Sequence, residues 1–263
     1  YYGEALRLLE EGIGDAATLD AMITAGGGFR MGPFVLMDLI GHDVNFAVTR
    51  SVWEQTFQDP RYRPSGAQGA LVAAGWLGRK TGRGFFRYDA PPPAAPAPQP
   101  ATPLDDAPRP FGAATLLPTC GATAREEATR RGAPVILRDV ALEPTRPGPL
   151  ALAASADVAP DDLAAAAAWL HASGRTPLRM PDLPGLVVLR LLAMLANEAE
   201  DGLHHGLATA EDMDLAMRHG TNWPLGPVAL GAALGRDVVR ATLDALHDTY
   251  RDPRYRASVR LRL

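Results

Sequence analysis

Side chains able to move a proton or bind a metal are few and scattered in this chain. We expect His42 to pair with Asp43 near a helix end, where a capping or helix-dipole role is the simpler account. His204 and His205 are adjacent, so on a helix they point about 100° apart and do not easily share a metal ion. Cys120 is the single cysteine, which excludes an internal disulfide and a cysteine-based zinc site. We expect no hydrolase triad and no metal site.

Composition narrows the class of protein. Hydrophobic residues make up 47% of the 263, enough for real cores, and the net charge is -4. No cluster of Lys and Arg is interleaved with aromatic residues, so nothing favours nucleic-acid binding. No apolar run approaches the roughly 18 residues of a membrane span. With one cysteine and no visible signal peptide, a reducing compartment fits, and we expect a cytoplasmic protein.

An internal repeat is the most informative pattern. Residues 4–43 and 198–237 align at a constant offset of 194, and the motif Asp-Pro-Arg-Tyr-Arg recurs at 59–63 and 252–256. An ordered set of Gly, Pro and Asp does not recur by chance, so we interpret this as a duplication. The matched residues include Gly12 with Gly206, Asp20 with Asp214, Gly26 with Gly220, Gly32-Pro33 with Gly226-Pro227, and Gly41 with Gly235.

Each copy is predicted to be helical. In the first copy we expect helices over residues 2–11, 16–25, 34–40 and 44–57. Gly12 supplies a left-handed position after the first helix, and Asp15 can cap the second. Pro33 lies in a first helical turn, where proline is tolerated.

The segment between the copies has another character. Residues 90–110 form a Pro/Ala-rich linker. Residues 111–181 alternate strands, expected at 113–117, 135–137, 150–153 and 177–180, with helices at 124–131 and 161–171, which favours a small α/β unit of parallel character. Its first turn holds the single Gly121, whereas a dinucleotide site needs closely spaced glycines there, so we expect no nucleotide site.

Three motifs carry a family resemblance. Residues 27–34 (GGFRMGPF), residues 78–86 (GRKTGRGFF) and, more weakly, residues 183–187 (LPGLV) resemble the C-terminal domain of 3-hydroxyacyl-CoA dehydrogenases, in the long bacterial 3-hydroxybutyryl-CoA dehydrogenase type. Taken singly, each Gly and Pro is explained as a helix end; the ordered set carries the resemblance.

The resemblance implies a mainly α fold. Two helical domains similar to the C-terminal domain of 6-phosphogluconate dehydrogenase would flank a small, reduced Rossmann-like α/β unit. The expected domains are residues 1–89 (copy one), the linker at 90–110, the α/β unit at 111–181, and residues 182–263 (a degenerate copy two).

The resemblance also implies oxidation of a 3-hydroxyacyl-CoA to the ketone by NAD, in acyl-CoA or aromatic-acid catabolism. In the family, the catalytic His–Glu pair and the NAD-binding loop belong to an N-terminal Rossmann domain. Because the chain begins at Tyr1 inside a helical pattern, we expect it to be a piece of a longer protein. Because it contains no counterpart of the His–Glu pair or of the NAD-binding loop, we expect it to be inactive alone. The family's site Asn corresponds to Leu189 in copy two and precedes Tyr1 in copy one, so no catalytic and no cofactor-binding residue is expected here.

Five residues are candidates for the substrate side of the pocket. By resemblance, Phe29, Arg30, Met31 and Pro33 face the acyl chain and the Rossmann domain. Phe29 and Met31 would form apolar walls, although core packing is the alternative. Arg30 and Lys80 would meet phosphates of CoA, with a solvated surface as the alternative.

Two hypotheses about function remain open. In the first, copy one completes an active site with the chain's own N-terminal Rossmann domain and an acyl-CoA substrate. In the second, the chain is a non-catalytic assembly module, forming a homodimer or an internal pseudo-dimer of copies one and two. The loss of the amide at Leu189 motivates the second hypothesis, because copy two then needs only to pack.

Overall fold

The computed structural model of the protein describes residues 1–89 and 100–263. The described chain divides into two compact units. The first contains Tyr1–Ala21, the residues from Met31 to the end of the first described range, and Asp252–Arg254. The second contains Met22–Arg30, the second described range up to Arg251, and Tyr255–Leu263. Each unit therefore combines segments from both copies of the repeat.

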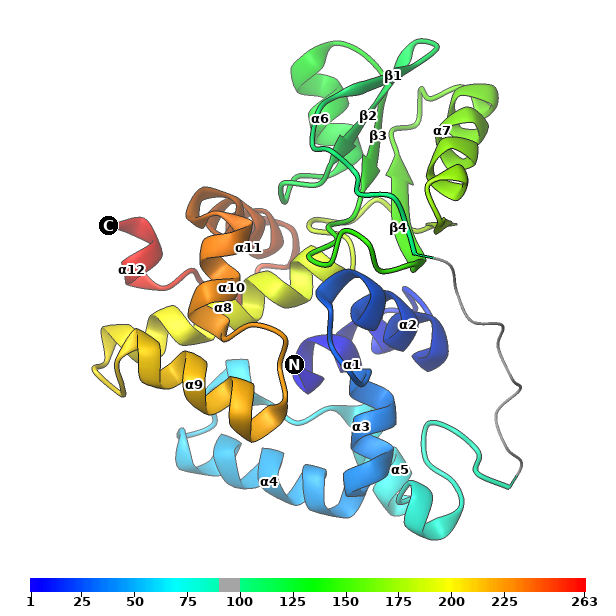
Figure 1. Cartoon of the computed structure of the whole chain (residues 1–263). Coiled ribbons are helices and arrows are strands. Elements are labelled where there is room, and N and C mark those ends of the chain that lie inside the picture. Colours follow the sequence, from blue (N-terminus) through cyan, green and yellow to red (C-terminus); the bar gives the residue numbers. More distant parts are fainter. Residues whose placement is uncertain (90–99) are drawn as a thin grey trace. The chain divides into compact units, whose positions relative to one another are not determined.

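Helices dominate the described residues, as the sequence predicts (Figure 1). None of the helices in the described ranges is both long and apolar enough to span a membrane. The α-helices are α1 (Tyr2–Glu10), α2 (Ala16–Gly27), α3 (Pro33–Ile40), α4 (His42–Gln55), α5 (Gly66–Ala73), α6 (Ala124–Arg131), α7 (Pro160–Ala172), α8 (Val188–His204), α9 (Ala210–Thr221), α10 (Pro227–Leu234), α11 (Arg236–Tyr250) and α12 (Val259–Arg262). The short 3-10 helices are η1 (Pro60–Tyr62), η2 (Arg79–Thr81) and η3 (Pro253–Tyr255), and the strands are β1 (Arg109–Phe111), β2 (Ala114–Pro118), β3 (Val135–Arg138), β4 (Gly148–Ala154) and β5 (Arg175–Arg179).

The first four helices lie where the Gly and Pro pattern predicts them. The Asp15 carboxylate accepts a hydrogen bond from the Thr18 N–H at 2.7 Å and so caps α2. That helix continues through Gly27, beyond its expected end, and Gly28 follows it at a φ of 74°. Pro33 is the first residue of α3, where no N–H is required.

The second copy repeats the backbone of the first. Gly206 follows α8 with a φ of 66°, as Gly12 follows α1 with a φ of 71°. Asn222 ends α9 in the left-handed region, at a φ of 55°, at the position equivalent to Gly28. Asn is the residue besides Gly that adopts this conformation most readily. The duplication therefore extends from sequence to dihedral angles.

Helix α5 is the α-helix of copy one that the sequence reasoning missed. Its N-cap is Ser65, whose hydroxyl accepts a hydrogen bond from the Gln68 N–H. The Ser65 hydroxyl also donates to the Glu10 carboxylate at 2.6 Å. A Ser followed three residues later by Gln is a local signal for a helix start, and it could have indicated α5.

The sheet lies in the second unit and has the order β1-β2-β3-β4-β5. β2 pairs with β3, and β4 pairs with β5, in parallel, as predicted. The other two pairs are antiparallel, so the expectation of a parallel unit is wrong for them. The reason is connectivity: α6 and α7 provide crossovers, whereas the 139–147 segment joins β3 to β4 without a helix. The predicted 90–110 linker lies partly outside the described residues, and its last two residues belong to β1.

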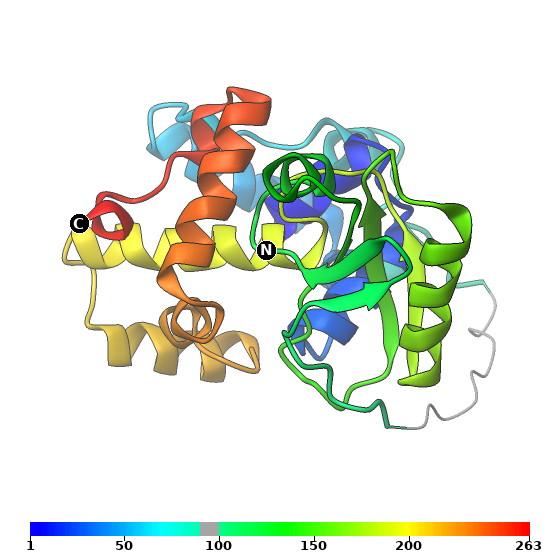
Figure 2. The same ribbon diagram turned by 90° about the horizontal axis from the view of Figure 1, so that it is seen from above.

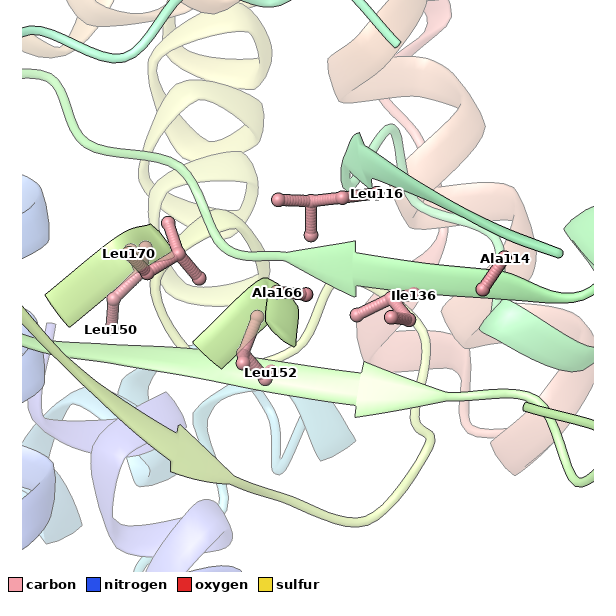
Figure 3. Packing of buried hydrophobic residues seen from close by; sticks show 7 residues of the cluster. All are labelled: Ala114, Leu116, Ile136, Leu150, Leu152, Ala166 and Leu170. Atoms are coloured by element: carbon pink, nitrogen blue, oxygen red, sulfur yellow. The ribbon is translucent and has the colours of Figure 1, made fainter. Parts of the chain in front are cut away.

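Helix α7 packs on one face of this sheet (Figure 3). Leu116 and Ile136 on neighbouring strands, and Leu150 and Leu152 on β4, project to the same side as the helix. Their alternation along each strand follows the two-residue period of β structure. The buried cluster consists of Ala114, Leu116, Ile136, Leu150, Leu152, Ala166 and Leu170.

Helix α8 is the long helix of the second unit, and α11 crosses it (yellow and orange in Figure 2). Arg190 of α8 is 0% exposed. Its guanidinium donates to the hydroxyls of Tyr250 at 2.9 Å and Tyr255 at 2.7 Å, and it also lies over both rings. These contacts satisfy a charge that would be costly to bury alone.

Candidate functional site

Asp20 organises the loop that carries the first family motif. Its carboxylate oxygens accept hydrogen bonds from the backbone N–H groups of Phe34 at 2.9 Å and Val35 at 2.8 Å, in the first turn of α3. A Cβ on Gly32 would lie 2.2 Å from the carboxyl carbon of Asp20, so only glycine fits. Burial raises the pKa of Asp20 to about 6, although the two backbone hydrogen bonds oppose the increase.

Copy two contains the same arrangement. Asp214 accepts hydrogen bonds from Val228 N–H at 2.8 Å and Ala229 N–H at 3.0 Å, at the start of α10. A Cβ on Gly226 would lie 2.2 Å from an Asp214 carboxylate oxygen. The repeated Asp and Gly-Pro residues are thus one structural device, in which a carboxylate of one helix caps the start of the next helix.

The predicted wall residues fall in both units. Phe29 is 3% exposed, and its ring meets the Trp223 ring edge to face within the second unit, with centroids 5.7 Å apart. Arg30 follows it and is exposed. In the first unit, the Met31 carbonyl accepts a hydrogen bond from the Tyr1 hydroxyl at 2.7 Å, and Pro33 is buried at the start of α3.

The 78–86 segment closes on Asp38 in the first unit. The Asp38 carboxylate accepts hydrogen bonds from Phe85 N–H and Phe86 N–H, each at 2.9 Å, and from the Tyr88 hydroxyl at 2.9 Å. A Cβ on Gly84 would lie 2.1 Å from an oxygen of Asp38. Burial raises the pKa of Asp38, but the hydrogen bonds outweigh burial and hold it below its ordinary value.

His42 does not pair with Asp43, contrary to the expectation. Its Nε2 lies 2.6 Å from Asp38 Oδ1, whereas Asp43 forms an ion pair with Lys80. The spacing of four residues brings Asp38 and His42 together across the bend at Gly41. Both side chains of the Asp38–His42 pair are 0% exposed, so neither touches a substrate, and the pair anchors the 78–86 segment. Lys80 is exposed, as a phosphate-binding residue must be.

Leu189, which the resemblance aligns with the family's Asn, is fully buried in the first turn of α8. The N–H groups of Val187, Val188 and Leu189 donate to the Asp139 carboxylate at 3.0, 2.8 and 3.1 Å. Asp139 directly follows β3 and is 0% exposed, and burial raises its pKa to about 6 despite these bonds. The start of α8 is therefore capped from within, and the Leu189 side chain belongs to the core.

The turn between β2 and α6 does not fit a dinucleotide. A pyrophosphate would need the free N–H groups at the start of α6. There, Asp182 accepts hydrogen bonds from Ala124 N–H at 2.6 Å and Arg125 N–H at 2.9 Å, and Thr123 and Glu126 form a capping box. The backbone at Gly121 is closely packed as well, because a Cβ added there would lie 2.6 Å from the Thr242 backbone. This leaves no room for a phosphate on that side of the turn. Among the described residues, no group of three or more His, Cys, Asp or Glu is placed to hold a metal ion.

Sequence reasoning missed the roles of four carboxylates: Asp20, Asp38, Asp139 and Asp182. Asp20 carries a signal in the repeat, because it recurs as Asp214 at the same distance before a Gly-Pro pair. The contact of Asp38 with His42, four residues on, is also local. The long-range backbone partners of Asp38, Asp139 and Asp182 lie 47 to 58 residues away in the chain, which local spacing does not reveal.

Two family models account for most of the chain. The 3-hydroxyacyl-CoA dehydrogenase C-terminal domain matches residues 1–88 and again residues 185–262. The 3-hydroxybutyryl-CoA dehydrogenase reduced Rossmann-fold domain matches residues 116–184. The chain belongs to the 3-hydroxyacyl-CoA dehydrogenase family, and it is similar to the long 3-hydroxybutyryl-CoA dehydrogenase type that the sequence motifs indicate.

Individual relatives agree. The 3-hydroxyadipyl-CoA dehydrogenase of Escherichia coli (strain K12) is 38% identical over 272 residues, which cover 100% of this chain and 56% of the relative. The crystal structure of 3-hydroxybutyryl-CoA dehydrogenase from Escherichia coli K12 is also 38% identical and superposes with a TM-score of 0.88, covering 100% of this chain and 57% of that one. The 3-hydroxybutyryl-CoA dehydrogenase of Clostridioides difficile is 40% identical over 83 residues, 32% of this chain and 30% of the relative. The chain spans a little over half the length of the relatives that it matches throughout.

Proposed function

We propose that this chain forms the substrate side of an NAD-dependent 3-hydroxyacyl-CoA dehydrogenase, which oxidises the 3-hydroxyl of an acyl-CoA to a ketone. The observation that carries the proposal is the loop of residues 27–34, in which Asp20 and Gly32 set the entry to α3. This loop and the 78–86 segment are the motifs of the matched family domain. The printed names of the relatives favour an acyl chain of 3-hydroxybutyryl-CoA or 3-hydroxyadipyl-CoA as the substrate.

In this proposal the residues of copy one bind and orient the substrate. Phe29 and Met31 form the apolar walls, Pro33 lies with them at the loop-to-helix step, and Arg30 and Lys80 contact CoA phosphates. The exposure of Arg30 and Lys80 supports that role. The burial of Phe29 against Trp223 is equally consistent with a core role, the alternative open for this residue.

The acid–base pair and the NAD site are assigned to a separate N-terminal Rossmann domain. The capped start of α6 supports this division, since Asp182 occupies the place where a Rossmann fold would receive a pyrophosphate. The buried Asp38–His42 pair supports it too, because a general base must reach its substrate. The chain alone is therefore expected to be inactive. We expect a cytoplasmic enzyme of acyl-CoA or aromatic-acid catabolism; the single thiol fits a reducing compartment, and the relatives' names fit acyl-CoA chemistry.

A second candidate function is that of an assembly module, in which copies one and two form an internal pseudo-dimer. Phe29 and Trp223 are equivalent positions at the offset of 194, and they contact each other. In a two-fold interface a residue meets its own equivalent only at the axis. Glu4 of copy one and Arg254 of copy two also form a buried ion pair within the first unit, at 3.9 Å. The homodimer is the alternative arrangement.

We further propose the domain limits of residues 1–89, 90–110, 111–181 and 182–263, with helical domains similar to the C-terminal domain of 6-phosphogluconate dehydrogenase. The Asp139 carboxylate accepts hydrogen bonds from the N–H groups of Val187 and Val188, at the start of α8. This contact between the α/β unit and the first helix of copy two supports a boundary near residue 182.

The test is kinetic and uses a full-length enzyme. The chain is fused to the N-terminal half of the Escherichia coli 3-hydroxyadipyl-CoA dehydrogenase, and NADH formation is followed with both acyl-CoA substrates. Arg30→Gln and Lys80→Gln are expected to raise KM for the acyl-CoA several-fold and to leave kcat unchanged. Arg146→Gln, a matched charge change outside the predicted wall, is the control. An unchanged KM in both variants would remove Arg30 and Lys80 from the substrate site.

A further inference from the structure

A cavity of about 430 Å³ lies entirely within the second unit, at one end of the sheet. Arg138, the last residue of β3, and Arg175, the first residue of β5, both line it. The topology brings them together, because β3 runs antiparallel to β4 while β4 and β5 are parallel. The end of β3 and the start of β5 therefore meet at the same edge of the sheet.

The two guanidinium groups differ in their partners. Arg138 donates to the Asp106 carboxylate at 2.8 Å and to the Asp105 carbonyl at 2.7 Å. Its charge is thus matched by a carboxylate. Arg175 donates from Nη2 to the Pro144 carbonyl at 2.5 Å, and among the described residues it forms no ion pair.

Arg175 is an uncompensated cation in a buried place. The residue is 2% exposed, and its Nε–H, also buried, has no acceptor among the residues that the structure describes. Burial, and the nearby charge of Arg138, lower the pKa of Arg175. Buried charges in proteins are normally paired, because leaving water is costly for an ion. We therefore expect a ligand with one negative charge to bind in this cavity and to pair with the Arg175 guanidinium.

The remaining walls are mainly apolar. Val140 and Leu142 follow β3, and Leu234 and Val238 come from the α10–α11 corner. A volume near 430 Å³ falls in the range of small-molecule sites. These walls match an anion that carries a short hydrocarbon body, and they offer inorganic phosphate little beyond the one charge.

We propose that this cavity binds a small organic monocarboxylate, with its carboxylate on Arg175 and its hydrocarbon chain against Val140, Leu142, Leu234 and Val238. The site is independent of the proposed dehydrogenase function. It is also distinct from a dinucleotide site, because the start of α6 is occupied by Asp182. The small α/β unit, together with α10 and α11, would then form a ligand-binding module.

Titration calorimetry of the full chain tests this with hexanoate, its neutral analogue hexanamide, and inorganic phosphate. Hexanoate is expected to bind saturably, and the other two are expected to bind at least about tenfold more weakly. Arg175→Gln is expected to weaken hexanoate binding by about tenfold or more, since it removes a charged hydrogen-bond donor. Arg179→Gln, on the exposed far part of the same strand, is the control and keeps full affinity.

The proposal is overturned if hexanoate gives no saturable heat, or if hexanamide or phosphate binds as tightly. Equal hexanoate affinity in wild type and a folded Arg175→Gln variant overturns it as well. If circular dichroism shows that Arg175→Gln is unfolded, Ala233→Trp takes its place. Ala233 lies exposed at the rim of the cavity, so a tryptophan there fills the cavity without touching the arginines' hydrogen bonds. Retained hexanoate affinity in that variant would also overturn the proposal.

Discussion

Phe29 and Trp223, equivalent residues of the two copies, lie edge to face with ring centroids 5.7 Å apart and planes at 81°. When two copies of a repeat are related by an approximate two-fold axis, equivalent residues of the two copies contact each other at that axis. The contact gives the Phe29 ring a packing role within the second unit, whether or not an acyl chain passes near it.

A double-mutant cycle measures this contact. We expect Phe29→Ala to lower the free energy of unfolding by about 3 kcal/mol, because the ring is buried, and Trp223→Ala by about 2 kcal/mol. The loss in the double variant should be about 1 kcal/mol smaller than the sum of the two single losses. This difference is the usual contribution of an edge-to-face ring pair beyond its buried area. Urea unfolding of the four proteins gives the coupling. Additive losses would mean that the rings do not support each other.

The two Gly-Pro corners give a second prediction, and copy two provides a matched control. Gly32→Ala and Gly226→Ala should each lower the free energy of unfolding by about 2 kcal/mol or more, since the new Cβ displaces a capping carboxylate. Gly220→Ala lies inside α9, where a Cβ meets nothing within 4 Å, and should be neutral or stabilising. Thermal unfolding of the three variants checks the order. A loss in Gly220→Ala as large as in the corner variants would contradict this account.

Stability should depend on pH through Asp139. Burial raises its folded-state pKa to about 6, above the unfolded value of about 3.9, so the folded protein holds this proton more strongly. The resulting stability is fully present below pH 4 and is lost as the pH rises through 6. Between pH 5 and 7.5 we expect a loss of about 1 kcal/mol from this group, and burial of Asp20 acts in the same direction.

The variant Asp139→Asn isolates this effect. It removes the titration and replaces one of the two carboxyl oxygens that accept from the α8 N–H groups, so it is less stable than wild type at both pH values. Its deficit should be about 1 kcal/mol smaller at pH 7.5 than at pH 5. Denaturant unfolding at the two pH values supplies the comparison, and an equal deficit at pH 5 and pH 7.5 would show that Asp139 is ionised throughout and would contradict the raised pKa.

Leu189 provides a test of the degenerate copy. The substitution Leu189→Asn introduces the residue that the resemblance predicts at this position. It places an amide in a fully buried site and should cost about 3 kcal/mol of stability. Leu189→Met, of similar volume, should cost about 1 kcal/mol or less. Equal stability of the Asn variant and the wild type would mean that the position still opens to a polar site.

The sequence predicted the helical framework well because its signals are local. Gly12, Gly28 and Pro33 act within a few residues of themselves, and the duplication doubled each signal. The pairing of His42 was predicted wrongly, since its neighbour Asp43 is turned toward Lys80 while Asp38 faces it across the Gly41 bend.

Long-range polar contacts were the part that spacing could not reveal. Asp139 and Asp182 each bind backbone groups of a helix far away in sequence, and nothing in the local pattern distinguishes them from surface carboxylates. The antiparallel pairing of β3 with β4 could not be predicted from local spacing either. The direction of a strand depends on whether the chain crosses over the sheet before it, and here the chain returns without a crossover helix. The roles of Phe29, Arg30, Met31, Pro33 and Lys80 in substrate binding stay predictions.

The account's central claim is that this chain supplies the substrate side of the dehydrogenase while the dinucleotide and the acid–base pair are held elsewhere. NADH formation from 3-hydroxybutyryl-CoA and NAD, measured side by side for the chain alone and for its fusion to a dinucleotide-binding half, tests this directly. We predict no turnover by the chain alone and clear turnover by the fusion beyond that of the dinucleotide-binding half. Turnover by the chain alone, or a folded fusion no more active than that half, would contradict the claim.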